Sequence, residues 1–126
     1  MFDFEQLDVY QKALQMNKEL FGFIKKCAWM DWFLQDQLKR AGVSCVANIA
    51  EGVGRFTVAD RRHFYVIARG SVFEVYALLQ IMAKVCEAEP HATDHLKSQL
   101  LDLSKMLFGL IRKTEIKIVI QPRSRT

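Results

Sequence analysis

The chain has 126 residues, of which 51% are hydrophobic and 25% are charged, a composition typical of one soluble globular domain with a proper core. No stretch approaches the roughly 18 uninterrupted apolar residues of a membrane helix. The net charge of +4 is unevenly placed, because residues 1–104 hold 12 basic and 13 acidic side chains, whereas residues 105–126 hold six basic and one acidic. The basic excess therefore lies entirely at the C-terminal end.

Three cysteines, at positions 27, 45 and 86, are odd in number, far apart and embedded in helical patterns. This arrangement predicts reduced thiols that act as small core residues, and it disfavours a disulfide framework. The acidic N-terminal segment has no basic-then-apolar leader, so we expect no secretion signal. Together these features predict a cytoplasmic protein with no membrane partner.

Apolar residues at helical spacing predict the first two helices. The first helix begins near Asp3, and the second begins at or just after Asp31 and ends near Gly52. Gly52 and Gly54 can adopt the left-handed geometry that ends a helix. The seam of the first helix steps by four and three residues alternately and consists of Val9, Ala13, Met16, Leu20, Phe23 and Cys27.

The third helix begins at Thr57, which with Asp60 resembles a capping box. It is apolar on most sides, and four helices of this size cannot bury one member completely. Part of its surface is therefore expected to meet another subunit. Pro90 fits either the turn before the fourth helix or its first helical position, and residues 116–120 either extend this helix or form an extended arm.

Four amphipathic helices with short connections predict an all-α fold, an antiparallel up-down four-helix bundle. We assign residues 1–115 to this bundle and residues 116–126 to a basic C-terminal tail.

Polar residues recur among small and apolar neighbours between residues 37 and 74. We interpret them as a network of hydrogen bonds and ion pairs that fixes helix register, in which Arg69 pairs with Glu51 or Glu74. The alternative, a catalytic cluster, lacks the cleft and nucleophile that acid–base chemistry needs. The members of the network are Asn48, Glu51, Arg69, Ser71 and Glu74.

His91 and His95 lie one helical turn apart beside Asp94, a spacing that permits metal binding. No third soft ligand is close in sequence, so we interpret the segment as a solvated first turn in which the helix dipole favours Asp94. No phosphate loop or compact catalytic signature is present. We expect no enzymatic activity, no cofactor or metal, and no small-molecule substrate.

Three segments together are similar to a known family: residues 4–13 (FEQLDVYQKA), residues 48–52 (NIAEG) with Arg55, and residues 68–71 (ARGS) with Glu74. The order and spacing of these segments resemble those of the motifs in proteins encoded by intervening sequences in bacterial large-subunit ribosomal RNA genes. The resemblance implies an up-down bundle that assembles into a ring, commonly a homopentamer, with no established catalytic activity. A related branch, the accessory variability proteins of diversity-generating retroelements, pairs a pentameric bundle with binding of nucleic acid and reverse transcriptase.

Family members tend to carry several lysines between the two internal motifs, where this chain has residues 56–59 (FTVA) ahead of two arginines. The basic candidates for nucleic-acid binding nevertheless form two groups, one around the second and third helices and one near the C-terminus. An assembled ring would multiply each group, and binding to phosphate backbones would then be salt-dependent and largely blind to sequence. The candidates are Lys39, Arg40, Arg55, Arg61, Arg62, Arg112, Lys113 and Lys117.

The apolar surface of the third helix predicts an oligomer interface formed by Tyr65, Val72, Phe73 and Tyr76. The alternative use of its aromatic residues is as stacking platforms for single-stranded bases. The leading hypothesis is a non-enzymatic, oligomeric accessory or scaffold protein with modest, salt-dependent binding of RNA, DNA or ribonucleoprotein. The alternative is a protein–protein adaptor whose basic tail docks on an acidic partner.

Overall fold

The computed structural model describes the backbone of residues 3–27 and 29–120, with side chains described for residues 4–5, 7–27 and 29–115. A short 3-10 helix, η1 (Asp3–Gln6), precedes four α-helices. These are α1 (Asp8–Lys26), α2 (Trp32–Val53), α3 (Val58–Val85) and α4 (Asp94–Ile120). No strand occurs in the described residues, and the predicted all-α class is confirmed.

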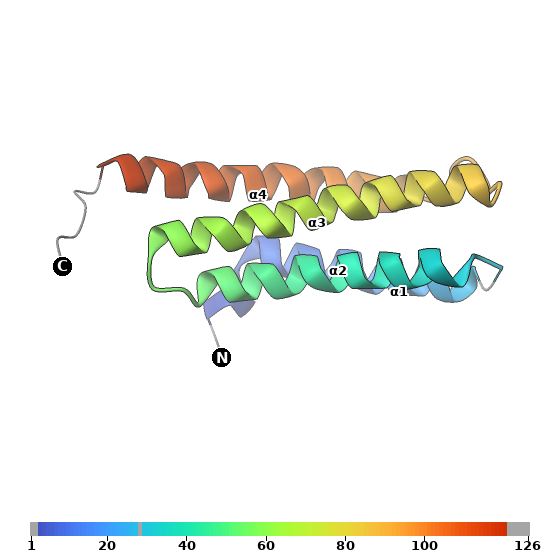
Figure 1. The fold of residues 1–126 in the computed structure, drawn as a ribbon, viewed down its shortest axis with the longest axis horizontal. Helices are drawn as coiled ribbons and strands as arrows, with labels where there is room; N and C mark the ends of the chain where they lie inside the picture. The colour runs from blue at the N-terminus through green and yellow to red at the C-terminus, as the bar shows by residue number, and fades with distance from the viewer. Residues whose placement is uncertain (1–2, 28, 121–126) are drawn as a thin grey trace.

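The four α-helices lie side by side along the long axis of the molecule, and the chain reverses direction between one helix and the next (Figure 1). Helix α3 packs against α2 and α4, and α1 completes the arrangement by packing against the same two helices. All four helices contribute to one core, in which the largest fully buried side chains include Met16, Leu20, Leu38, Ile49, Leu79, Met82, Leu103 and Leu107. The predicted seams therefore face one another, as burial of apolar stripes requires.

Side-chain caps determine where α2 and α3 begin. The Asp31 carboxylate accepts hydrogen bonds from the backbone N–H groups of Phe33 and Leu34, at 2.8 and 3.4 Å. The Thr57 hydroxyl accepts one from the N–H of Asp60 at 3.1 Å. Both starts are as predicted, because an oxygen at the cap position satisfies amides that have no partner within the helix.

The start of α1 differs from the prediction, and of the two alternatives for Pro90 the structure has the turn. Helix α1 begins at Asp8, since the segment near Asp3 forms the separate 3-10 turn. Helix α4 begins at Asp94, after a turn in which Glu87 adopts a left-handed backbone conformation with φ 51°. The backbone of residues 116–120 continues α4, which decides between the two conformations left open above in favour of the helix.

The left-handed geometry that Gly52 and Gly54 could adopt is not used at the end of α2. No described glycine has a positive φ, and Gly54 is right-handed with φ −76°. Gly52 instead lies where a Cβ atom would come within 2.7 Å of the Tyr65 ring and 3.2 Å of the Arg61 carbonyl oxygen. The glycine is needed there because α2 and α3 approach each other closely.

Helix α3 is long and apolar enough, by length and composition alone, to cross a membrane. Core helices of soluble proteins can be equally long and apolar. In α3, 33% of the most apolar stretch is buried inside the molecule. Its remaining apolar surface faces outward, as the sequence predicted.

Candidate interaction surfaces

Within the predicted polar network, two members meet through a residue that the sequence analysis missed. The Ser71 hydroxyl on α3 lies 2.9 Å from the hydroxyl of Ser44 on α2. The Asn48 side-chain amide donates to the Ser44 carbonyl at 2.8 Å and to its hydroxyl at 3.0 Å. Ser44 thus joins the two helices at their buried contact. Its position four residues before Asn48, on the same side of the helix, was the available signal.

The predicted pairing of Arg69 with Glu51 or Glu74 is wrong. Among the described residues Arg69 forms no ion pair, and Glu51 pairs instead with Arg55, four residues further along the chain and just after α2. Glu74 lies five residues from Arg69, which places it on another side of α3. Arg69 points toward α4, where its Nε donates to the carbonyl oxygen of Ser104 at 3.3 Å.

The exposed surface between α3 and α4 is apolar and hollowed. Its rim includes Phe73 and Phe108, which are 53% and 48% exposed, together with Val66 and Leu101. We call these four side chains the α3–α4 face. The surface has two hollows, of about 470 and 390 Å³, and Phe73 lines both of them. The Arg69 guanidinium lies 4.6 Å from the centre of the Phe73 ring and 5.5 Å from that of Phe108, a cation–π arrangement.

Two members of the predicted oligomer interface lie elsewhere. Tyr65 and Val72 are only 4% and 1% exposed, so they pack inside the chain and cannot form a contact between chains without unpacking it. Desolvation by burial raises the pKa of the Tyr65 hydroxyl, and nearby Arg61 only partly opposes this. Tyr76 is half-buried beneath Lys97, which leaves Phe73 as the one exposed residue of the predicted set.

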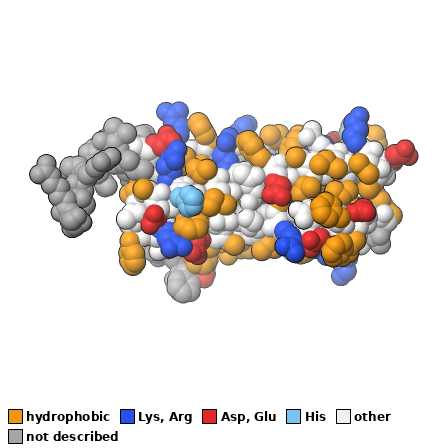
Figure 2. All heavy atoms as spheres, in the orientation of Figure 1, with side chains coloured by type: hydrophobic (Ala, Val, Ile, Leu, Met, Phe, Trp, Pro, Cys, Tyr) orange, Lys and Arg blue, Asp and Glu red, His pale blue; other side chains and the backbone are white. Residues whose placement is uncertain are grey.

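The structure brings together five basic residues that the sequence placed in two separate groups. Arg62 of α3 pairs with Glu115 of α4 at 2.6 Å, and Arg61 and Lys113 line one hollow between the same helices. The five basic residues at this end of the molecule, which we call the basic end, are Arg55, Arg61, Arg62, Arg112 and Lys113. Figure 2 shows basic side chains and a histidine on this end of one face, beside acidic groups.

The other basic candidates do not join the basic end. Lys39 lies over the Phe21 ring of α1 at 5.9 Å, and Arg40 pairs with Asp36 at 2.9 Å. Arg40 lies 13 residues before the end of α2 at Val53, about 20 Å at the rise of an α-helix, and Arg55 follows that end. The side chain of Lys117 lies outside the described residues.

Carboxylates neutralise part of the charge at the basic end. Arg55 and Arg62 are paired with Glu51 and Glu115. These ion pairs are solvent-exposed, and such pairs contribute little, about 0 to 1 kcal/mol. Their arginines are therefore able to exchange a carboxylate for another anion. Arg61, Arg112 and Lys113 have no carboxylate partner within the part of the chain that the structure describes.

The histidines expected at the start of α4 are held by carboxylates. The Nδ1 atom of His91 lies 2.8 Å from Asp94, and that of His95 lies 2.8 Å from Glu19. Desolvation alone would raise the pKa of Glu19, but hydrogen bonds from His95 and two glutamines lower it below its usual value. No group of three or more potential metal ligands occurs in residues 3–27 and 29–120.

The cysteines are free in the described residues. Cys45 is fully buried on α2, and desolvation raises the pKa of its thiol to about 12. Burial, with a smaller effect of Cys86, also raises the pKa of Cys27. Thiols whose thiolate form is disfavoured in this way are poor nucleophiles and poor metal ligands.

These observations define an elongated all-α protein with four helices, an apolar α3–α4 face and a basic end. Its sequence belongs to the 23S rRNA-intervening sequence protein family, whose sequence model matches residues 5–109. The resemblance found in the three motifs is thereby confirmed. No curated protein matches the chain.

A solved structure shares the fold. It is a protein of unknown function from the S23 ribosomal protein family of Bacteroides thetaiotaomicron, and it superimposes with a TM-score of 0.76. The match covers 82% of this chain and 97% of the other, at 20% sequence identity. At that identity the likeness establishes the fold alone.

Proposed function

We propose that this protein is a non-enzymatic accessory or scaffold protein that binds nucleic acid through phosphate contacts and acts as an oligomer in the cytoplasm. The supporting observation is the meeting of Arg61 and Arg62 with Arg112 and Lys113 at one end of the molecule. Residues more than 40 positions apart in sequence form this end, so the fold itself concentrates the positive charge. Clustered cations release counterions from a phosphate backbone and bind it without reading its bases.

Oligomerisation would multiply this charge. We propose that the helices form an antiparallel up-down bundle, and that copies associate through the α3–α4 face into a ring, as the resemblance to pentameric proteins implies. An exposed apolar face hollowed between two helices is typical of an interaction site. In a closed ring every copy presents the same end in the same direction, so the basic ends would form a ring of positive charge.

The test is a salt series of RNA and DNA binding by the wild-type protein and two double variants. Arg112→Gln/Lys113→Gln removes two cations of the basic end, whereas Lys39→Gln/Arg40→Gln removes the same charge from the middle of α2. The first variant should bind about tenfold more weakly at low salt and show a shallower salt dependence, because fewer phosphates are neutralised. The second should behave as the wild type, and light scattering should show one assembly mass for all three proteins.

The alternative is a protein–protein adaptor without nucleic-acid binding. It is supported by the pairing of Arg55 and Arg62 with carboxylates of the same chain, since this leaves a modest net charge at the basic end. An absence of RNA and DNA binding even at the lowest salt concentration would favour the adaptor and refute nucleic-acid binding.

A further inference from the structure

The turn between α2 and α3 presents an aromatic ring entirely to solvent. Phe56 is 99% exposed, although a single exposed apolar residue is ordinary and by itself indicates nothing. Phe56 differs from other exposed apolar residues because it lies beside Arg55, within the basic end. The resemblance to the intervening-sequence family would lead one to expect lysines at this turn.

The turn that carries Phe56 is held on both sides. On one side, the N–H of Arg55 donates to the Gly52 carbonyl at 3.2 Å, and its own carbonyl accepts from the Arg61 guanidinium at 3.0 Å. On the other side, Thr57 caps α3 through the N–H of Asp60. A ring on a tethered turn loses little backbone freedom when it binds a partner.

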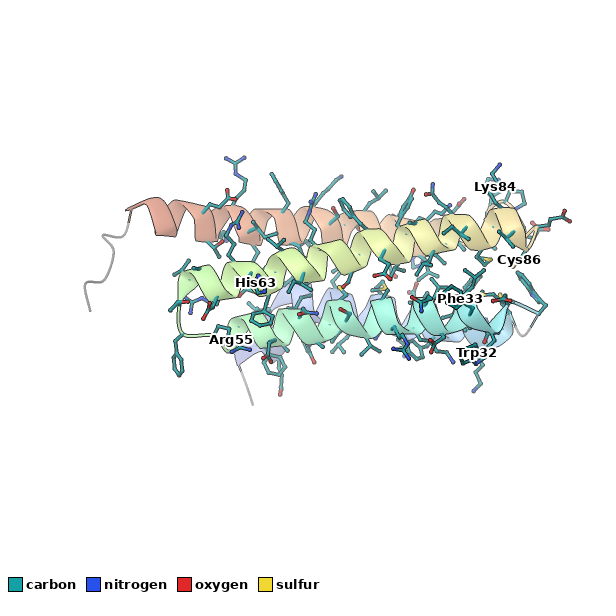
Figure 3. All side chains as sticks on the ribbon, in the orientation of Figure 1. Trp32, Phe33, Arg55, His63, Lys84 and Cys86 are labelled. Carbon is teal, nitrogen blue, oxygen red and sulfur yellow. The ribbon has the colours of Figure 1, made fainter. Side chains whose placement is uncertain are left out.

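The surroundings of the turn add further planar and cationic groups. The Arg55 guanidinium lies 4.5 Å from the centre of the Phe64 ring. His63, which is exposed, meets the same ring edge-on, with centroids 5.3 Å apart. Arg55 and His63 both lie at the end where α2 passes into α3 (Figure 3).

An aromatic ring among guanidinium groups matches a ligand that carries both phosphates and accessible flat faces. Unpaired nucleotides have both, and proteins bind them by stacking bases on aromatic side chains beside a positively charged track. In a duplex the base faces are stacked on one another, which makes them inaccessible to Phe56.

The aromatic residues considered from the sequence are less suitable for this role. Tyr65 is buried and Tyr76 half-buried. The ring of Phe73 already carries the Arg69 guanidinium. Phe56 is thus the aromatic ring of the basic end that stands free for stacking, among the side chains the structure describes.

We propose that the basic end binds single-stranded nucleic acid, with Phe56 stacking on an unpaired base. This inference rests on the proposed nucleic-acid binding and specifies the form of nucleic acid that is recognised.

The experiment compares Phe56→Ala and Phe56→Trp with wild type, using fluorescence anisotropy of a short labelled mixed-sequence RNA, its perfect duplex, and the single-stranded DNA of the same sequence. Phe56→Ala should weaken single-strand binding about tenfold, because stacking on an aromatic residue contributes about 1 to 3 kcal/mol per base. Phe56→Trp should retain the affinity, and duplex binding should not change. Trp32→Ala is the matched control, since Trp32 is 75% exposed and lies at the opposite end of the molecule (Figure 3).

The outcomes separate this inference from the proposal beneath it. If Phe56→Ala binds single strands as tightly as wild type while Arg112→Gln/Lys113→Gln binds them more weakly, stacking by Phe56 is refuted and phosphate binding stands. An equal loss on single strands and duplex also overturns the inference, because Phe56 would then not distinguish unpaired bases. If wild type binds no nucleic acid, both proposals are overturned. Circular dichroism of each variant establishes that it is folded.

Discussion

The close approach of α2 and α3 at Gly52 predicts that an alanine there destabilises the protein. The added Cβ would lie 2.7 Å from Cε1 and 2.9 Å from Cδ1 of Tyr65, and 3.2 Å from the backbone oxygen of Arg61. Tyr65 is buried and Arg61 belongs to a helix, so neither can yield without moving α3. Overpacking of this kind costs about 1 to 3 kcal/mol.

A gain in helix propensity opposes that cost. Replacing glycine by alanine inside a helix stabilises it by about 1 kcal/mol, so the net loss for Gly52→Ala is at most about 2 kcal/mol. Gly22 provides the matched control, because it also lies within a helix but has nothing within 4 Å of its ideal Cβ position. Gly22→Ala should therefore stabilise the protein by about 0.5 to 1 kcal/mol. The two substitutions are chemically identical and differ in the predicted sign.

Urea unfolding followed by circular dichroism measures both free energies. All variants are compared at one chain concentration, because association makes apparent stability depend on concentration. Adding Tyr65→Leu to each protein completes a double-mutant cycle, in which Gly52→Ala should become less costly once the ring is gone. If Gly52→Ala is at least as stable as wild type, or if its cost is the same without the Tyr65 ring, the close contact is not what requires glycine here.

Two further predictions concern the other faces of the helices. Phe73→Glu should reduce the assembly to a single chain in light scattering, because association through the α3–α4 face would bury a carboxylate beside Phe108. The control is Phe33→Glu, at a similarly exposed position on α2, which should leave the mass unchanged. An unaltered mass for Phe73→Glu would contradict association through this face. Under native conditions a maleimide should modify Cys86 long before Cys45, because Cys45 is fully buried with a thiol pKa raised to about 12. Equal labelling rates, measured by mass spectrometry, would show that the core around Cys45 opens readily.

The sequence predicted those parts of the fold that depend on local chemistry. Asp31 and Thr57 start their helices because a side-chain oxygen at a cap acts only on amides two or three residues ahead. The start of α4 could not be fixed from the sequence, because proline is compatible with both a turn and a first helical position. No local sequence signal distinguishes these two positions for Pro90. The choice depends on how the segment between α3 and α4 packs.

The candidate site was less predictable, because helical spacing shows which residues share a face but not what the face meets. Arg69 was predicted to pair with a carboxylate. Its side chain instead lies toward α4, where it contacts two phenyl rings and donates a hydrogen bond to a backbone carbonyl. The basic end could be predicted only as two groups, since the contact of Arg62 with Glu115 depends on how α3 and α4 lie against each other. Gly52 was recognised as a motif residue, yet its function is to make room for Tyr65, a distance that no spacing encodes.

The surroundings of Arg69 are compatible with the proposed association through the α3–α4 face. In the single chain its guanidinium covers parts of the Phe73 and Phe108 rings, while its Nε is already bound to the Ser104 carbonyl. Covering the face would desolvate a cation, which is costly when the cation lacks partners. Here the partners come from the same chain, and cation–π attraction strengthens as water is removed. The proposed association would therefore need no carboxylate from a second copy to neutralise Arg69, which is consistent with a face lined mainly by apolar side chains.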